Sequence, residues 1–238
     1  MTSDFEELDC RATAMGEISL RRRREPRLRI DVYEVKLGEE FLMSSLFTDG
    51  EIALARLGLT ACAPGPLDVV VGGLGLGYTA RAVLEHPAVR ALLVIEALPA
   101  VIDWHRAGLV PLGNALCADA RCRFLAGDFF AWADSRNSAA PEPAQRFDAV
   151  LLDIDHSPRH TLHPAHAAFY SAEGLHRLAN RLRPNGVFGL WSNDPPDQEF
   201  LATLAGAFAA AQAHVVEFHN PLQDCTAINT VYVCRNGD

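Results

Sequence analysis

The stretch LDVVVGGLGLGYTARAVL, residues 67–84, carries the pattern that decides the fold. Its apolar run at 67–71 predicts a buried strand, four glycines follow within 72–77, and an amphipathic segment at 78–86 predicts a helix. Glycines between a strand and a helix let the backbone approach a ligand closely, while the free N–H groups of the helix start face that ligand. The stretch therefore predicts the first unit of a ligand-binding α/β sheet.

The same alternation continues on the C-terminal side of this stretch. Apolar runs at 91–95, 122–126, 147–153 and 186–191 alternate with amphipathic segments near 99–108, 129–134, 165–183 and 197–211. This is typical of βαβ units around a parallel sheet. Two last runs, 213–218 and 229–234, are joined by a loop and are expected to pair antiparallel. We predict an α/β, Rossmann-like doubly wound sheet, with 135–146 as a surface loop.

Residues 1–60 have a different pattern. Short, partly alternating stretches at 27–35 and 40–47 predict small antiparallel strands, and a helix is expected to begin near Asp49. We therefore predict two parts: an N-terminal β appendage with a linking helix at 1–60, and a Rossmann-like catalytic domain at 61–238.

Composition excludes several classes of protein. Of 238 residues, 49% are hydrophobic and 21% charged, which is typical of a globular chain. A net charge of -9 argues against nucleic-acid binding. No apolar run approaches the roughly 18 residues that span a bilayer, and the acidic N-terminus does not resemble a signal peptide, so we expect a cytoplasmic protein without membrane contact. The six cysteines form no C-x-x-C pair. The run Arg21 to Arg24 is interpreted as a solvated strand edge or subunit contact.

The glycine spacing favours a nucleoside ligand. Gly73, Gly75 and Gly77 form G-x-G-x-G, the spacing found in nucleoside-binding transferases. The dinucleotide fingerprint would need a third glycine where Tyr78 stands.

Acidic residues end the next two predicted strands. Glu96 ends the second strand, where a carboxylate can accept hydrogen bonds from both ribose hydroxyls. Asp128 ends the third, placed to accept an adenine amino group, with Phe129 packing on the ring. Each acid alone has an alternative role as a helix N-cap.

The fourth strand end is where an acceptor is expected, because doubly wound sheets bind ligands beyond the carboxyl ends of their strands. Group transfer needs an acceptor that can lose a proton, and Asp153, Asp155 and His156 are the candidate bases. Alternatively, Asp155 only caps a turn before Pro158.

Three further residues are candidates for contact with the acceptor: Tyr170, Asn193 and Asp194. Their alternatives are core packing for Tyr170 and helix capping by Asp194 or Asp197. His156, His160, His163 and His166 form a cluster whose spacing fits no standard zinc motif, so no metal is predicted.

From about Val32 to Leu190 the sequence resembles the spermidine synthase-like branch of the class I S-adenosylmethionine (SAM) transferases. The matching pieces are 71–73, 94–96, 127–128, 147–153, 169–170 and 182–186. The resemblance implies a seven-stranded sheet with a reversed last hairpin, an N-terminal β appendage used for oligomer contacts, and SAM or decarboxylated SAM in the strand-end crevice. It also implies that Asp153 deprotonates or orients an amine.

Two departures from that family bear on the reaction. Aminopropyltransferases of the family have a Gly-Gly-Gly-Asp-Gly-Gly turn, whose aspartate binds the amine of decarboxylated SAM, whereas Gly75 stands at that position here. The family's Asp-Ser-Ser-Asp-Pro motif is changed to residues 153–158, Asp-Ile-Asp-His-Ser-Pro, which shifts Asp155 against the second family aspartate.

Our leading hypothesis is therefore a SAM-dependent transferase that methylates, or otherwise alkylates, a small amine-bearing acceptor. The alternatives are a true polyamine aminopropyltransferase that uses decarboxylated SAM and places its counter-ion elsewhere, and a non-catalytic nucleoside-binding protein. Short apolar strands at the N-terminus would leave exposed edges, so a homodimer through these strands is also expected.

Overall fold

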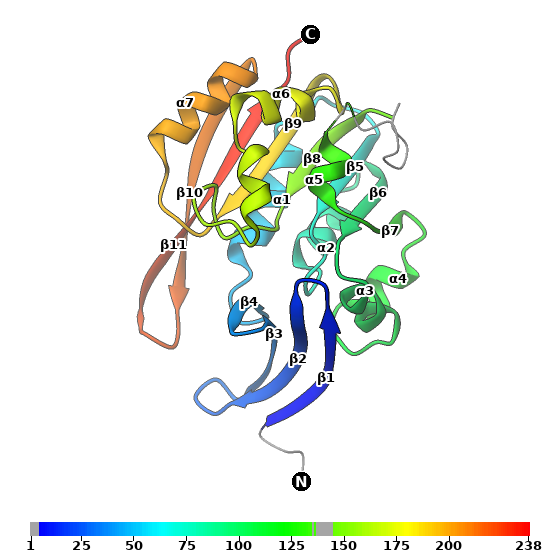
Figure 1. The fold of residues 1–238 in the computed structure, drawn as a ribbon, viewed down its shortest axis with the longest axis vertical. Helices are drawn as coiled ribbons and strands as arrows, with labels where there is room; N and C mark the ends of the chain where they lie inside the picture. The colour runs from blue at the N-terminus through cyan, green and yellow to red at the C-terminus, as the bar shows by residue number, and fades with distance from the viewer. Residues whose placement is uncertain (1–4, 135, 137–144) are drawn as a thin grey trace.

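The computed structural model describes residues 5–134, 136 and 145–238, which form two β-sheets (Figure 1). The predicted surface loop at 135–146 lies for the most part outside the described residues. The N-terminal sheet is antiparallel, in the order β1-β2-β3-β4. Its strands are β1 (Phe5–Thr13), β2 (Gly16–Glu25), β3 (Ile30–Leu37) and β4 (Glu40–Ser44).

The large sheet has seven strands in the order β10-β11-β9-β8-β5-β6-β7. The five central strands are parallel, and β11 and β10 close the sheet as an antiparallel hairpin. The predicted Rossmann-like fold class, including the reversed last hairpin, is thus confirmed. The strands are β5 (Leu67–Gly72), β6 (Val89–Glu96), β7 (Cys122–Ala126), β8 (Phe147–Leu152), β9 (Leu182–Ser192), β10 (Ala210–Asn220) and β11 (Cys225–Arg235).

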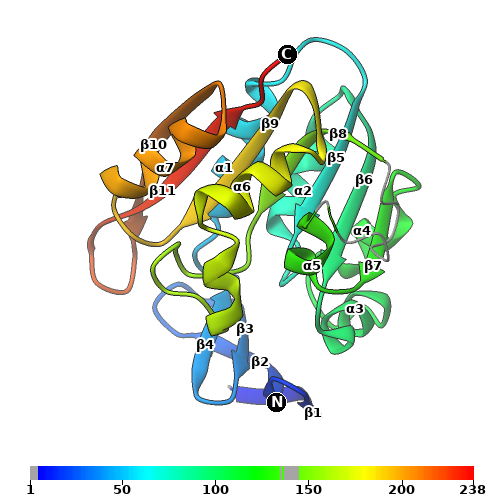
Figure 2. The same ribbon diagram turned by 45° about the horizontal axis from the view of Figure 1, so that its top comes forward.

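Helices cover both faces of this sheet (Figure 2). Helices α1 to α4 pack in one hydrophobic core and α5 to α7 in the other. The helices are α1 (Asp49–Thr60), α2 (Tyr78–Glu85), α3 (Pro99–Arg106), α4 (Gly113–Ala118), α5 (Phe129–Ala133), α6 (Ala172–Ala179) and α7 (Gln198–Ala207), with a 3-10 helix, η1, at Pro164–Ala168. None of the helices in the described part of the chain is long and apolar enough to cross a membrane.

The unbroken apolar runs of the central strands follow from burial on both faces. Val69 and Val71 of β5 point into the first core, whereas Val70 between them points into the second. Successive side chains of a strand alternate between faces, so a strand covered by helices on both sides needs apolar residues at every position. These runs therefore identify the strands from sequence alone.

Helix α1 lies on the large sheet, although it follows the N-terminal strands in the chain. Two glycines allow the close approach: a Cβ at Gly58 would lie 2.6 Å from a methyl carbon of Leu151 on β8, and a Cβ at Gly189 on β9 would lie 3.0 Å from one of Leu54. This packing brings the first turn of α1 to the edge where the central strands end.

The N-terminal sheet includes two strands that the pattern did not predict, β1 and β2. They are rich in charge, and the run Arg21 to Arg24 forms ion pairs with acids of the neighbouring strands and of β2 itself. Cross-strand charge pairs stabilise such a sheet without the apolar alternation that marks a half-buried strand. The inner residues Ile18 and Leu20 of β2 are nevertheless fully buried.

The predicted long helix at 165–183 is also wrong in detail, because the chain forms η1 and α6 there. Ser171 separates them: its hydroxyl accepts the Gly174 N–H at 3.1 Å and so begins a new helix. The short helix α4 was not predicted either, and its burial pattern, with only Gly113 and Leu116 buried, explains why.

Candidate active site

A cavity of about 380 Å³ lies between the carboxyl ends of the central strands and the N-terminal sheet. Figure 1 shows the N-terminal sheet at one end of the large sheet. Residues at the ends of β5, β6, β7 and β8 form one wall, and apolar side chains of β3 and β4 form the opposite wall. Both parts of the chain therefore contribute to one site.

The glycine turn after β5 forms the floor of this cavity. Gly73 has a φ of 93°, and a Cβ there would lie 2.1 Å from the carbonyl oxygen of Asp153. Only glycine fits such a backbone contact at a positive φ. Gly73 and Gly75 line the cavity, whereas Gly77 precedes α2 and packs near His105 and Leu116.

Glu96 holds the turn in place from the end of β6. Its Oε2 accepts the Leu74 N–H and its Oε1 accepts the Leu98 N–H, both at 2.9 Å. Burial raises the pKa of Glu96, and these backbone donors act in the opposite direction. Because Glu96 also lines the cavity, its carboxylate can accept hydrogen bonds from the hydroxyl groups of a ligand bound there.

Asp128 lies at the N-terminus of α5 and lines the cavity as well. Its Oδ1 accepts the Phe130 N–H at 2.8 Å, so Asp128 caps α5 with this oxygen. Phe129 is buried against Gly72, where a Cβ would lie 2.5 Å from its ring. Phe130, which the sequence analysis missed, stacks on His166 with ring centroids 3.9 Å apart, and both line the cavity.

Two further acids line the cavity. Asp153 follows β8 directly, and its Oδ2 accepts the hydroxyl of Thr79 at 2.6 Å. Glu51, in the first turn of α1, lines the same cavity and is only 8% exposed. The sequence pattern offered no signal for Glu51, because nothing in it places α1 against the strand ends.

Asp155 does not line the cavity. Its side chain is buried and accepts three hydrogen bonds: from the Tyr170 hydroxyl at 2.7 Å, from the Leu162 N–H at 2.7 Å, and at His166 Nδ1 at 2.9 Å. Tyr170, near the end of the segment between β8 and α6, is likewise buried. This network fixes the segment that carries His163 and His166 into the cavity wall.

His156 does line the cavity, and its Nε2 lies 3.1 Å from Glu40 Oε1 of the N-terminal sheet. Asn193, directly after β9, supports it, because the Asn193 N–H donates to the His156 carbonyl at 2.7 Å. The side chain of Asn193 instead accepts a hydrogen bond from Asn229. His156 thus joins the two sheets across one rim of the site.

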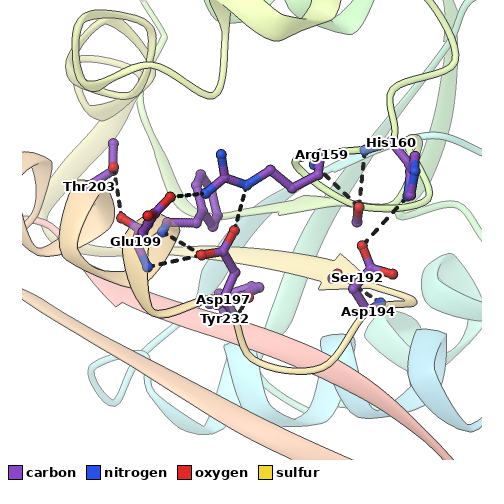
Figure 3. Close-up of polar contacts among 10 residues, drawn as sticks. Arg159, His160, Ser192, Asp194, Asp197, Glu199, Thr203 and Tyr232 are labelled. Carbon is purple, nitrogen blue, oxygen red and sulfur yellow. Dashed lines mark hydrogen bonds and ion pairs between the residues drawn. The ribbon is translucent and has the colours of Figure 1, made fainter.

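Asp194 does not line the cavity, and the close-up in Figure 3 shows it near Ser192 and His160. Its carboxylate points toward His160, 3.8 Å away. Asp197, rather than Asp194, caps α7 by accepting the Glu199 and Phe200 N–H groups. Arg159 then binds Asp197 at 2.7 Å and Glu199 at 2.8 Å, which anchors the chain after Pro158 to α7.

Among the residues that the structure describes, no group of three or more His, Cys, Asp or Glu side chains is placed to hold a metal ion. The histidines that cluster in the sequence are used separately. His163 caps η1, whereas His166 binds Asp155.

The opposite wall includes Met43 of β4. Its sulfur lies 2.9 Å from the Leu76 nitrogen and lies directly over Gly75. The sequence analysis missed this contact, because the pairing of the two sheets joins residues more than thirty positions apart. Taken together, the cavity lining combines the carboxyl groups of Glu96, Asp128, Asp153 and Glu51 with apolar side chains.

The chain matches known proteins over much of its length. The spermine/spermidine synthase domain matches residues 54–215. "Polyamine aminopropyltransferase 2" of Pseudomonas aeruginosa is 27% identical over 159 residues, which are 63% of this chain and 42% of that protein. "Polyamine aminopropyltransferase 2" of Streptomyces coelicolor is 35% identical over 120 residues, 50% of this chain and 20% of that protein. The chain thus spans less than half the length of these curated relatives.

A solved structure shows the same fold. The spermidine synthase of Thermotoga maritima superposes with a TM-score of 0.72 at 16% identity, covering 97% of this chain and 73% of that one.

Proposed function

The chain belongs to the spermine/spermidine synthase domain family, and on that premise we propose that it transfers an aminopropyl group from decarboxylated SAM to a small amine. The names of the relatives support this reaction, and none of those reported above names the methylation of amines. The sequence-based alternative is therefore preferred to the leading hypothesis of methyl transfer.

One observation carries the proposal: the charge of the cavity wall. Four carboxyl groups line it, from Glu51, Glu96, Asp128 and Asp153, and its described lining contains no arginine or lysine. Such a site attracts cations, and both a sulfonium donor and an amine acceptor are cations. SAM carries an α-carboxylate for which this lining offers no arginine or lysine, whereas decarboxylated SAM carries no such carboxylate.

The donor end fits a nucleoside. Gly73 packs its backbone against the Asp153 carbonyl and lines the cavity, Glu96 would accept the ribose hydroxyls, and Asp128 would accept the adenine amino group. Phe130 and Ile95 offer apolar walls for the ring. When bound, decarboxylated SAM supplies an aminopropyl carbon activated by the neighbouring sulfonium.

Asp153 is the proposed base at the acceptor end. An alkylammonium must lose a proton before its nitrogen can attack, and a carboxylate within reach of that nitrogen can accept it. The Thr79 hydroxyl, donating to Oδ2 at 2.6 Å, orients the Asp153 carboxylate. Asp155 and Tyr170 are proposed to position the surrounding segment rather than to contact the acceptor.

The test is product identification with the purified chain. With decarboxylated SAM and putrescine, we expect methylthioadenosine and an aminopropylated amine. With SAM in place of decarboxylated SAM, we expect no S-adenosylhomocysteine. Failure to form methylthioadenosine with a panel of diamines and triamines would overturn the proposal.

Methyl transfer from SAM stays the second candidate because of one specific observation. Gly75 lacks the acid that the family uses for the aminopropyl amine, and Met43 fills the space beside it. Formation of S-adenosylhomocysteine from SAM would favour this candidate. Donor binding without turnover would instead favour a nucleoside-binding protein.

A homodimer through the N-terminal strands is part of the proposal. Strands β1 and β4 are the edges of that sheet, and Phe5 and Phe41 on them are 52% and 46% exposed. Unpaired edges with apolar side chains favour association. Sedimentation at the mass of one chain would refute the dimer.

A further inference from the structure

The proposed reaction assigns no role to Glu51, although its carboxyl group lies at the cavity. It lies in the first turn of α1, is 8% exposed, and lines the cavity together with Asp153. A glutamate buried at this position is costly to keep, because burial disfavours its charged form.

Thr79 places the two acids side by side. Its hydroxyl donates to Asp153 at 2.6 Å and lies 3.5 Å from the backbone carbonyl of Glu51. Thr79 itself is buried in the first turn of α2. The ends of α1, α2 and β8 therefore meet at one point, with both carboxyl groups at the cavity wall.

No cation of the described chain balances this pair: neither carboxyl group has an arginine, lysine or histidine partner within ion-pair distance there. The titratable groups that face Glu51 are Asp153 after β8, Asp49 on its own helix and Tyr78 on α2. None of them supplies a positive charge. Burial, and then the charge of Asp153, raises the pKa of Glu51 to about 8, and burial raises the pKa of Asp153 to about 6.

We infer that Glu51 and Asp153 together form a binding site for one substrate ammonium group, with Glu51 as an additional substrate-binding residue from α1. This inference rests on the proposed function, because that function supplies the ammonium. An ammonium between the two carboxyl groups is the cation that the pair lacks, and it hydrogen-bonds to both. The group comes from the acceptor amine or from the aminopropyl chain of the donor.

The site has a signature that a purely structural glutamate would lack. At pH 7 the ligand-free pair holds a proton on Glu51, and a bound ammonium favours the ionised form of both acids. Binding therefore releases up to one proton into the solvent. Calorimetry in two buffers with different ionisation enthalpies measures this release directly.

The experiment compares wild type, Glu51→Gln and the matched control Asp49→Asn, which removes a carboxylate from the same helix turn at an exposed position. Each is titrated with putrescine and, separately, with decarboxylated SAM. For wild type and Asp49→Asn we expect proton release with at least one ligand. For Glu51→Gln we expect no release and affinity for that ligand weaker by roughly 30-fold or more.

The ligand affected identifies the source of the ammonium: putrescine alone indicates the acceptor, and decarboxylated SAM alone the donor. Wild-type affinity and proton release in Glu51→Gln would overturn the inference. So would absent proton release in wild type, a result that holds even if the variant fails to fold. Turnover assays of wild type test the proposed function separately. Glu51-dependent binding without formation of methylthioadenosine would support the ammonium-binding site and contradict the proposed aminopropyl transfer.

Discussion

Met43 occupies the space that any side chain at position 75 would need: a Cβ built on Gly75 would lie 2.3 Å from the Met43 sulfur. The two residues come from different sheets, and the Leu76 nitrogen lies 2.9 Å from the same sulfur. The absence of a side chain at position 75 thus makes room for the methionine above it. A carboxylate placed there requires Met43 to move.

The first prediction restores that carboxylate. Gly75→Asp alone should disturb packing by about 1–3 kcal/mol, because the new side chain overlaps Met43. Combined with Met43→Ala, which makes room, it should bind decarboxylated SAM roughly tenfold more tightly than Met43→Ala does, through a new ion pair. Aspartate tolerates the φ of 46° at this position better than most residues. Calorimetric titration measures the affinity, and Gly75→Asn with Met43→Ala is the uncharged control. Equal affinity of the aspartate and asparagine variants would contradict this prediction.

The second prediction concerns Glu96. Glu96→Gln turns one acceptor oxygen into a donor that faces a backbone N–H, and it weakens the proposed bonds to ribose. We expect donor binding weaker by roughly 10- to 100-fold. Glu85→Gln, on the exposed end of α2, is the control, and isothermal titration is the measurement. Undiminished binding in Glu96→Gln would remove Glu96 from the proposed nucleoside site.

The third prediction separates positioning from catalysis at Asp155. Tyr170→Phe removes one of the three donors to the buried carboxylate and should cost about 1–3 kcal/mol of folding stability. This corresponds to a lower melting temperature by roughly 2–12 °C for a chain of this size. We expect the change in kcat, expressed as an activation free energy, to be smaller than the loss of folding stability. If Asp155→Asn kept the melting temperature but abolished turnover, Asp155 would instead belong among the catalytic residues.

The central strands of the large sheet, such as β5 and β8, were predictable because they are buried on both faces. An unbroken apolar run such as 149–152 is hard to explain in any other way, and the acids at the strand ends follow from it. Glu96, Asp128 and Asp153 accordingly lie at one cavity. The resemblance to the spermidine synthase-like branch added the reversed hairpin, which the last two apolar runs also indicated.

The other wall of the site could not be predicted in the same way. Met43 and Glu51 enter the cavity because α1 packs on β8 and β9 and draws the N-terminal sheet over the strand ends. That packing depends on Gly58 and Gly189 and on contacts between distant residues, which leave no periodic signal. Conversely, Asp155 and Asp194 follow strands as the other acids do, but a one- or two-residue turn directs them to Tyr170 and His160 instead.

The last prediction follows from Glu51 and Asp153, which have no cationic partner among the described residues. Burial and mutual repulsion raise the pKa of Glu51 to about 8, well above the 4.5 of a free glutamate. Between these values the unfolded chain releases a proton that the folded chain keeps, so the folded state binds more protons and loses stability as pH rises. Glu51→Gln removes this penalty. We therefore expect the ligand-free variant to match wild type near pH 4 and to be more stable by on the order of 1–3 kcal/mol at pH 8.

Chemical denaturation from pH 4 to pH 9 measures this difference. Asp49→Asn serves as the control, because it removes a carboxylate from an exposed position of the same helix turn. A buried residue that lowers stability when it is unliganded is expected where function, rather than folding, retains it. Saturating putrescine or decarboxylated SAM should close the gap between wild type and Glu51→Gln at pH 8, since a bound ammonium stabilises only the ionised pair. If the stability difference between wild type and Glu51→Gln were absent, or became smaller as pH rises without ligand, the prediction would be wrong. Glu51 would then not be the source of a pH-dependent loss of stability.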